Sequence, residues 1–246
     1  MMKTLFSRFL VFAVIIALWQ AITFVVPPYI IPTPYNVLLA CLADFSLLST
    51  ALCITLIEAL IGFIGAILLA CGISLLMHAH PRLKSLLYPP IVFSQAIPIL
   101  AFAPLFVLWF GFGYMPKIIT VVLICFFPIT VTLTDGLAAV SEQRINMMKT
   151  FGATPVQIVR HVQFPSALGH LFAGMKISVA YSIMAAIIGE WLGGTGGIGV
   201  YMIRVQRAFA LDKMFAAIAV IVAVTGMLFV LIRLFQRILI PWSDRE

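Results

Sequence analysis

Few residues in this chain have the types and spacing that chemistry requires. Gly194, Gly196 and Gly199 satisfy the G-x-G-x-x-G pattern, but a dinucleotide site needs a preceding strand and a βαβ unit, and this run follows a long apolar segment. We interpret these glycines as a tight re-entrant or connecting turn. His78 and His80 lack further ligands nearby, so we expect polar loop residues and no metal site. No Walker A sequence, Ser/His/Asp set or H-E-x-x-H helix is present, which leaves no catalytic residues and places any ATP on another chain.

Composition determines the elements that must position the remaining polar residues. Of 246 residues, 63% are hydrophobic and 9% are charged, against about half and about a quarter in soluble domains. So few charges cannot cover a water-facing surface, and a bilayer is the natural solvent. We therefore expect one all-α polytopic membrane domain over residues 1–246. The four cysteines, Cys41, Cys53, Cys71 and Cys125, form no C-x-x-C pair and are expected to be small buried hydrophobes.

Apolar runs predict about six transmembrane helices, since about 20 residues cross the ~30 Å hydrocarbon core. They cover residues 9–26, 48–77, 86–110, 117–134, 170–191 and 213–239. The second run is long enough to tilt or to extend past the membrane. The first resembles a signal peptide, but it is long for one and ends at Pro27 and Pro28 without a small-residue cleavage site, so we expect a retained span.

The distribution of basic residues predicts the orientation. With the N-terminus inside, eleven of the 15 Lys and Arg residues fall in inner segments and four fall in outer segments. The outer four are Lys117, Arg204, Arg207 and Lys213, and Arg245 is among the inner ones. Because cytoplasmic loops are enriched in Lys and Arg, both termini are expected in the cytoplasm.

Four residues inside the apolar runs are candidates for a translocation pathway. Glu58 and Glu190 are ionisable, and such residues within a membrane usually face a cavity or a partner. Gln95 and Pro98 belong to the third run, which is rich in proline, and a helix broken by proline is tolerated beside packed helices or a water-filled cavity. Helix packing or a helix-end contact is the alternative for each.

The polar stretch around residues 140–166 is the longest between two spans. Its apolar residues recur at roughly helical spacing, which predicts short amphipathic helices across the inner face. Gly152 is expected to make the turn between them, Pro155 to take an early helical position, and Pro165 to end the second helix. Such a surface suits either a groove on a partner protein or the lipid interface.

This loop resembles the conserved cytoplasmic loop of ABC importer permeases, whose pattern is E-A-A, three residues, Gly, nine residues, Ile, one residue, Leu-Pro. Gly152, Val162, Phe164 and Pro165 stand at the matching positions. The E-A-A positions fall on Asn146, Met147 and Met148, so that part of the pattern is absent. This departure removes the Glu of the pattern and leaves the turn and the apolar docking surface intact.

Three further segments are similar to the nitrate, sulfonate and taurine branch of these permeases. They are IPTPYNV (31–37), PILAFAPLFVLWFGFGYMPKI (98–118) and GEWLGGTGGIGVYM (189–202). The Gly-Glu-Trp form at 189–191 and the stretch 207–216 look more like permeases for thiamine-precursor pyrimidines. The resemblance therefore implies a pyrimidine solute, with sulfonates, taurine and nitrate-like solutes as the alternatives.

The resemblance also implies a fold and an assembly. The fold is that of a type I ABC importer permease in a bacterial inner membrane. Its partners are a second copy of the chain, a cytoplasmic ABC ATPase dimer and an external solute-binding protein, with no nucleic acid and no cofactor of its own. The loop residues expected to couple to the ATPase are Met148, Phe151, Gly152, Ala153, Pro155, Val162, Phe164 and Pro165.

Two other classes of protein remain as alternatives. A stand-alone channel or secondary carrier would work without an ATPase, and its uptake would survive ATP depletion. An intramembrane enzyme would need a reactive pair of side chains within a span, and the sequence contains none.

Overall fold

The computed structural model describes residues 2–27, 29–98 and 101–241, with the backbone alone for residues 2–9 and 12. The described residues are mostly helical and include no strand. Pro28 of the predicted connector and Arg245 of the orientation argument lie outside them. This architecture confirms the all-α class expected from the composition.

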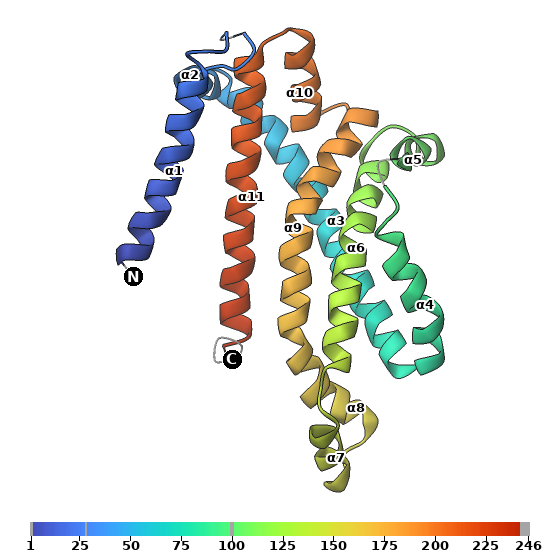
Figure 1. Cartoon of the computed structure of the whole chain (residues 1–246). Helices are drawn as coiled ribbons and strands as arrows, with labels where there is room; N and C mark the ends of the chain where they lie inside the picture. Colours follow the sequence, from blue (N-terminus) through green and yellow to red (C-terminus); the bar gives the residue numbers. More distant parts are fainter. Residues whose placement is uncertain (1, 28, 99–100, 242–246) are drawn as a thin grey trace.

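Four helices of the described chain are long and apolar enough to cross a membrane. They are α3 (Phe45–Ala79), α6 (Tyr114–Ala138), α9 (Phe164–Gly193) and α11 (Leu211–Leu239). Each contains one of the predicted spans, which confirms those at 48–77, 117–134, 170–191 and 213–239. The 35 residues of α3 make a helix of about 52 Å at 1.5 Å per residue, longer than the hydrocarbon core, and α3 runs obliquely across the molecule (Figure 1).

The N-terminal helix α1 (Met2–Ile22) begins and ends earlier than the predicted span at 9–26. It stands apart from the other long helices in Figure 1. A short helix, α2 (Pro34–Ala43), follows the proline-rich connector, with Thr33 Oγ1 accepting the Asn36 N–H at 3.2 Å. Trp19 Nε1 donates to the Pro32 carbonyl at 3.1 Å and ties α1 to this connector.

The third predicted span, over 86–110, is not one helix. The structure divides it into α4 (Pro81–Ser94) and α5 (Ala103–Phe110). Pro98 lies in the interruption, and its ring removes a backbone donor that a continuous helix would need. Pro89 and Pro90 are accommodated within α4, whereas Pro104 falls in the first turn of α5, where a proline costs no hydrogen bond.

The core of the molecule lies where α6 packs between α3 and α9, at glycines that allow close approach. A Cβ added to Gly62 of α3 would lie 2.5 Å from Val121 Cβ of α6, and one added to Gly174 of α9 would lie 3.0 Å from Ile129 Cα. Small residues at such contacts let membrane helices pack backbone to backbone. These contacts bring α3 and α9 close against α6.

Two short helices, α7 (Glu142–Thr150) and α8 (Pro155–Ile158), form one end of the molecule, and α10 (Ile198–Arg207) lies at the other. In Figure 1, α1 begins and α11 ends on the side of α7 and α8. We call the end with α7 and α8 the inner end and the opposite one the outer end.

Candidate functional site

The loop between α6 and α9 carries apolar side chains that the described part of the chain leaves largely exposed. Met147, Phe151 and Val156 are exposed, Phe151 to 79%, and we call these three residues the loop surface. Among the predicted coupling residues, Gly152 and Pro155 are also exposed, while Met148, Ala153, Val162, Phe164 and Pro165 are partly buried. Met147 and Val156 were absent from the predicted set, although both follow its helical spacing.

The turn within this loop has the predicted local structure. Gly152 adopts a φ of +77°, a left-handed conformation that favours glycine. Thr154 and Gln157 then form a capping box, in which the Thr154 N–H donates to Gln157 Oε1 at 2.8 Å and Thr154 Oγ1 accepts the Gln157 N–H at 3.4 Å. Pro155 takes the first helical position, as expected.

Pro165 does not end the second helix, contrary to the prediction. The chain from Pro155 to Gly193 is helical throughout, because a π-helical segment at Val159–Gln163 joins α8 to α9. In this segment the Phe164 N–H bonds to the Val159 carbonyl. The wider π turn lets the proline ring sit in the first turn of α9 without breaking the helix. Val156 of the loop surface is thereby joined to a membrane-spanning helix without a break, while Met147 and Phe151 stand before the Gly152 turn.

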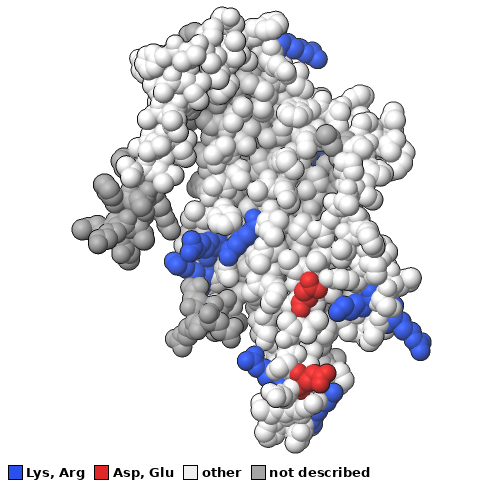
Figure 2. All heavy atoms as spheres, in the orientation of Figure 1, with Lys and Arg blue, Asp and Glu red and all other residues white. Residues whose placement is uncertain are grey.

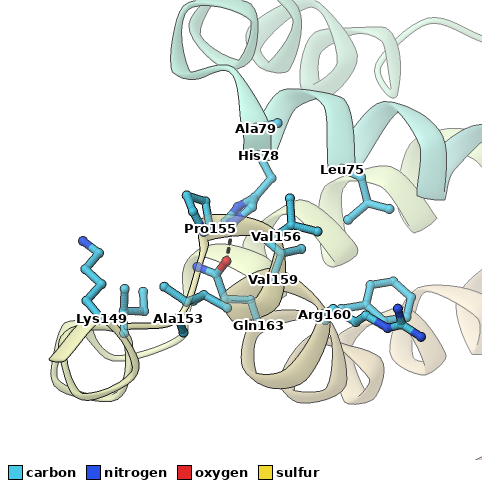
Figure 3. Close-up of a pocket in the computed structure, with 13 residues that line it drawn as sticks. Leu75, His78, Ala79, Lys149, Ala153, Pro155, Val156, Val159, Arg160 and Gln163 are labelled. Carbon is cyan, nitrogen blue, oxygen red and sulfur yellow. Dashed lines mark hydrogen bonds between the residues drawn. The ribbon is translucent and has the colours of Figure 1, made fainter. Parts of the chain in front are cut away.

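A cavity of about 710 Å³ lies between this helical segment and the inner end of α3. Its walls include Leu75, His78 and Ala79 of α3 and Val156, Val159 and Gln163 of the loop (Figure 3). His78 Nε2 donates to Gln163 Oε1 at 2.8 Å across the cavity. His78 is therefore not a plain loop residue. Its partner lies 85 positions further along the chain, so no local sequence pattern predicts their contact.

On the face that Figure 2 displays, charged side chains lie mainly between mid-height and the inner end, and few stand nearer the outer end. Other charged side chains lie inside the molecule. Glu58 of α3 and Lys117 of α6 form an ion pair in which both side chains are buried. The second oxygen of Glu58, Oε2, has no partner among the described residues. Lys117 was expected in an outer loop, but α6 begins three residues earlier than its predicted span and turns Lys117 towards α3.

Glu190 lies beside this pair at the outer end of α9 and is 1% exposed. Its carboxylate accepts the Thr55 hydroxyl at 2.6 Å and the Gly199 N–H at 2.6 Å. Thr55 Oγ1 in turn accepts the Ile198 N–H at 2.8 Å. Both backbone donors belong to the first turn of α10, where an anion is favoured by the helix dipole. We call Thr55, Glu58, Lys117 and Glu190 the outer network.

The glycine run makes the connecting turn between α9 and α10, as predicted. Gly197 has a φ of +110°, and a Cβ added there would overlap the Glu190 carboxylate. Gly199 has no room for a side chain either, because its Cβ would lie 2.8 Å from Glu190 Oε2. The glycines therefore serve the close approach of backbone to a buried carboxylate.

A more exposed cluster stands at the same end. Asp44 accepts Lys213 Nζ and the Tyr201 hydroxyl, each at 2.9 Å, and so links the start of α3 to α10 and α11. The hydrogen bond from Lys213 lowers the pKa of Asp44 below its ordinary value. Burial, followed by the hydrogen bond to Asp44, raises the pKa of the Tyr201 hydroxyl.

Gln95 and Pro98 line a cavity of about 470 Å³. It lies between α6, α9 and the non-helical segment that separates α4 from α5. We call this cavity the groove. Glu58 and Glu190 do not line it. The four candidate pathway residues therefore occupy two places, and their part in solute passage stays a prediction. Among the described residues no group of three or more His, Cys, Asp or Glu side chains has the arrangement of a metal site.

Comparison with known proteins gives a consistent match. The family described as "Binding-protein-dependent transport system inner membrane component" matches residues 62–245. The formylaminopyrimidine transport permease protein ThiX of Halalkalibacterium halodurans is 34% identical over 239 residues, covering 96% of each chain. The putative aliphatic sulfonates transport permease protein SsuC of Bacillus subtilis is 31% identical, covering 94% of this chain and 86% of its own.

A solved structure shares the fold. The MetNI methionine ABC transporter in an inward-facing conformation superposes with a TM-score of 0.69, covering 80% of this chain and 98% of the other. The two sequences are 19% identical, so this likeness bears on the architecture of the helices and not on the solute.

Proposed function

The chain belongs to the family of binding-protein-dependent transport system inner membrane components, the permeases of ABC importers, and we propose that the solute it carries is a pyrimidine. The observation that carries this proposal is the 34% identity to a formylaminopyrimidine permease over 96% of both chains. Sulfonates, including taurine, are the alternative class, because a sulfonate permease is 31% identical.

We further propose that the loop surface docks on a cytoplasmic ABC ATPase, which binds and hydrolyses the ATP. Its three exposed apolar side chains, on short helices, suit a groove on a protein partner. Phe151 and Val156 flank the Gly152 turn and the capping box, which hold the backbone in one conformation. A preformed surface binds with a smaller loss of conformational entropy than a flexible one.

The continuous helix from Pro155 to Gly193 supports a mechanism for coupling. A displacement of the docked loop would be transmitted along α9 to Glu190 and the first turn of α10 at the outer end. Alternation between inward-open and outward-open states would then move both ends of α9 together. The bond between His78 and Gln163 would carry part of the same displacement into α3.

The proposed assembly contains two copies of this chain, two ATPase subunits inside and a solute-binding protein outside. Both termini lie in the cytoplasm in this arrangement. The positions of α1 and α11 support it, because α1 begins and α11 ends on the side of the loop surface (Figure 1). The excess of Lys and Arg in the inner segments supports the same orientation.

The first test is co-purification. The tagged chain, solubilised in a mild detergent, is expected to retain an ABC ATPase at one copy per permease. Repeated preparations without an ATPase, in several mild detergents and with ATP present, would favour a stand-alone channel or secondary carrier instead.

The second test measures the solute. The purified complex with its binding protein is placed in proteoliposomes containing ATP, and uptake of labelled formylaminopyrimidine and of taurine is compared. Pyrimidine uptake that stops when ATP is omitted supports the full proposal. ATP-driven uptake of taurine alone would keep the importer and replace its solute, whereas uptake that persists without ATP would contradict the coupling.

A further inference from the structure

The interruption between α4 and α5 brings polar groups to a depth where a continuous helix would show none. The 14 residues of α4 cover about 21 Å from its inner end, so the interruption falls well inside a hydrocarbon core of about 30 Å. Gln95 follows directly and is exposed. Irregular backbone and an exposed amide at this depth are tolerated where they line a water-filled cavity or are covered by protein.

The groove occupies this position. Facing Gln95 and Pro98 are Phe127 and Pro128 of α6 and Tyr181 of α9, which is 42% exposed. The volume of about 470 Å³ lies within the range of small-molecule sites, about 300–1,000 Å³. Two aromatic side chains and one amide thus surround a space large enough for a small solute.

The groups around the groove favour one kind of ligand. Phe127 and Tyr181 offer flat apolar faces, on which another ring can stack. The Gln95 amide and the Tyr181 hydroxyl can both donate and accept hydrogen bonds. Ile124 also lines the groove. In an α-helix its carbonyl would accept the N–H of residue 128, but that residue is a proline and has no N–H to donate. A planar ring with donors and acceptors at its edge would satisfy these groups.

Electrostatics argues against an anionic ligand in the groove. None of the described residues that line the groove is charged. The cation of the outer network, Lys117, is buried and already paired with Glu58. An anion within the membrane is costly unless a cation or several donors compensate it. A sulfonate or nitrate would find no such compensation among the side chains of the groove.

We propose that the groove is a solute site on the translocation pathway and that it binds a neutral heteroaromatic ring, which stacks on Tyr181 and is hydrogen-bonded at its edge by Gln95. This assignment rests on the proposed function, since it takes the chain to be an importer of a pyrimidine. It adds that this permease itself selects for an uncharged ring after the external binding protein releases it.

The transport test uses Tyr181→Leu and Gln95→Leu in the complete complex, with formylaminopyrimidine as the probe. Each change is expected to reduce its uptake about tenfold, the size of a lost aromatic contact, while the ATPase still co-purifies. Tyr35→Leu is the matched control, because Tyr35 is an exposed tyrosine on α2 that does not line the groove. The complex with Tyr35→Leu is expected to take up formylaminopyrimidine as fast as the unaltered complex.

A second measurement detects the site without transport. Gln95→Cys and Tyr181→Cys are treated, in membranes, with a charged and membrane-impermeant thiosulfonate reagent, against the background of the native cysteines. Both are expected to react at least tenfold faster than Leu68→Cys, which stands on an exposed apolar face of α3, and formylaminopyrimidine is expected to slow them. Reaction no faster than at Leu68→Cys would mean that the groove faces lipid and would overturn the site.

The outcomes separate the two proposals. If the unaltered complex imports formylaminopyrimidine and both leucine variants import it equally well, the site is wrong and the importer of a pyrimidine stands. If the complex imports taurine and no pyrimidine, the neutral-ring assignment fails together with the proposed solute. If no ATPase co-purifies and uptake ignores ATP, the proposed function itself fails.

Discussion

Helix α9 connects two regions that are built in opposite ways. At its inner end lies the loop surface, where Phe151 and Val156 are largely exposed. At its outer end Glu190 is buried and accepts hydrogen bonds from Thr55 and Gly199. The inner region exposes apolar side chains to its surroundings, whereas the charged groups of the outer region are buried and paired mostly within the chain.

This difference predicts how each region responds to substitution. Buried charges that lose a partner destabilise the folded protein strongly, whereas exposed apolar side chains contribute little to folding. Changes at the outer network should therefore reduce the stability of the chain. Changes at the loop surface should leave the chain folded and remove the ATPase.

The largest loss of stability is expected for Lys117→Ala. It leaves the buried Glu58 carboxylate without its cation, and breaking a buried pair in this way costs about 3–5 kcal/mol. The melting temperature of the detergent-solubilised chain measures the effect. Lys149→Ala, at an exposed lysine on α7, serves as the control.

The double variant Lys117→Met with Glu58→Gln removes the pair as a whole. It is expected to recover most of the lost stability, because no unpaired charge remains. If the double variant melts as low as Lys117→Ala, the loss comes from packing and the electrostatic account is wrong.

Glu190→Ala should have the next largest effect. It removes the acceptor of the Thr55 hydroxyl and of the Gly199 N–H, and hydrogen bonds to a charged group contribute about 1.5–3 kcal/mol. Uptake is expected to fall while the ATPase still co-purifies, since the loop surface is at the other end of α9. Unchanged uptake would remove Glu190 from the candidate pathway residues.

At the inner end, Gly152→Arg is expected to reverse this pattern. The left-handed φ of +77° costs a non-glycine residue about 1–2 kcal/mol, so the chain should still insert and fold. The long side chain beside Phe151 should abolish co-purification of the ATPase. Thr150→Ser, at an exposed residue of α7 outside the predicted coupling set, is the control. Normal ATPase recovery with Gly152→Arg would contradict the docking role.

The same contrast explains which features could be predicted from the sequence. Long apolar runs predict α3, α6, α9 and α11, because bilayer thickness sets the length of a spanning helix. The turn at Gly152 and the position of Pro155 follow from local backbone preferences. Features that depend on residues adjacent in the sequence could therefore be predicted without the structure.

Pairings between distant residues were not available. The partner of Glu58 stands 59 residues away and had been placed in an outer loop. The contact between His78 and Gln163 has no local pattern. Pro165 was expected to end a helix, since the rule for proline assumes an α-helical turn before it, and the π segment supplies a different one. The sequence also did not show that the helix stops before Pro98 and that a new helix, α5, begins at Ala103.

The smallest effect is expected at the partly exposed ion pair of the outer end, between Asp44 and Lys213. The hydrogen bond from Lys213 lowers the pKa of Asp44, so the folded chain binds this proton less readily than the unfolded chain. The pair therefore adds stability above the unfolded pKa, about 3.9, and this contribution is lost as the pH falls through the lower folded value. For a pair near the surface the contribution is at most about 1 kcal/mol.

Melting temperatures of the unaltered chain and of Asp44→Asn, measured between pH 7 and pH 3, test this. The difference between them should be small at pH 7 and should shrink as the pH falls below the unfolded pKa of about 3.9 and Asp44 becomes protonated. A difference at pH 7 as large as that of Lys117→Ala would mean that exposure does not separate the two ion pairs of the outer end. The contrast between buried and exposed charges would then fail for Asp44 and Glu58, the acidic members of the two pairs.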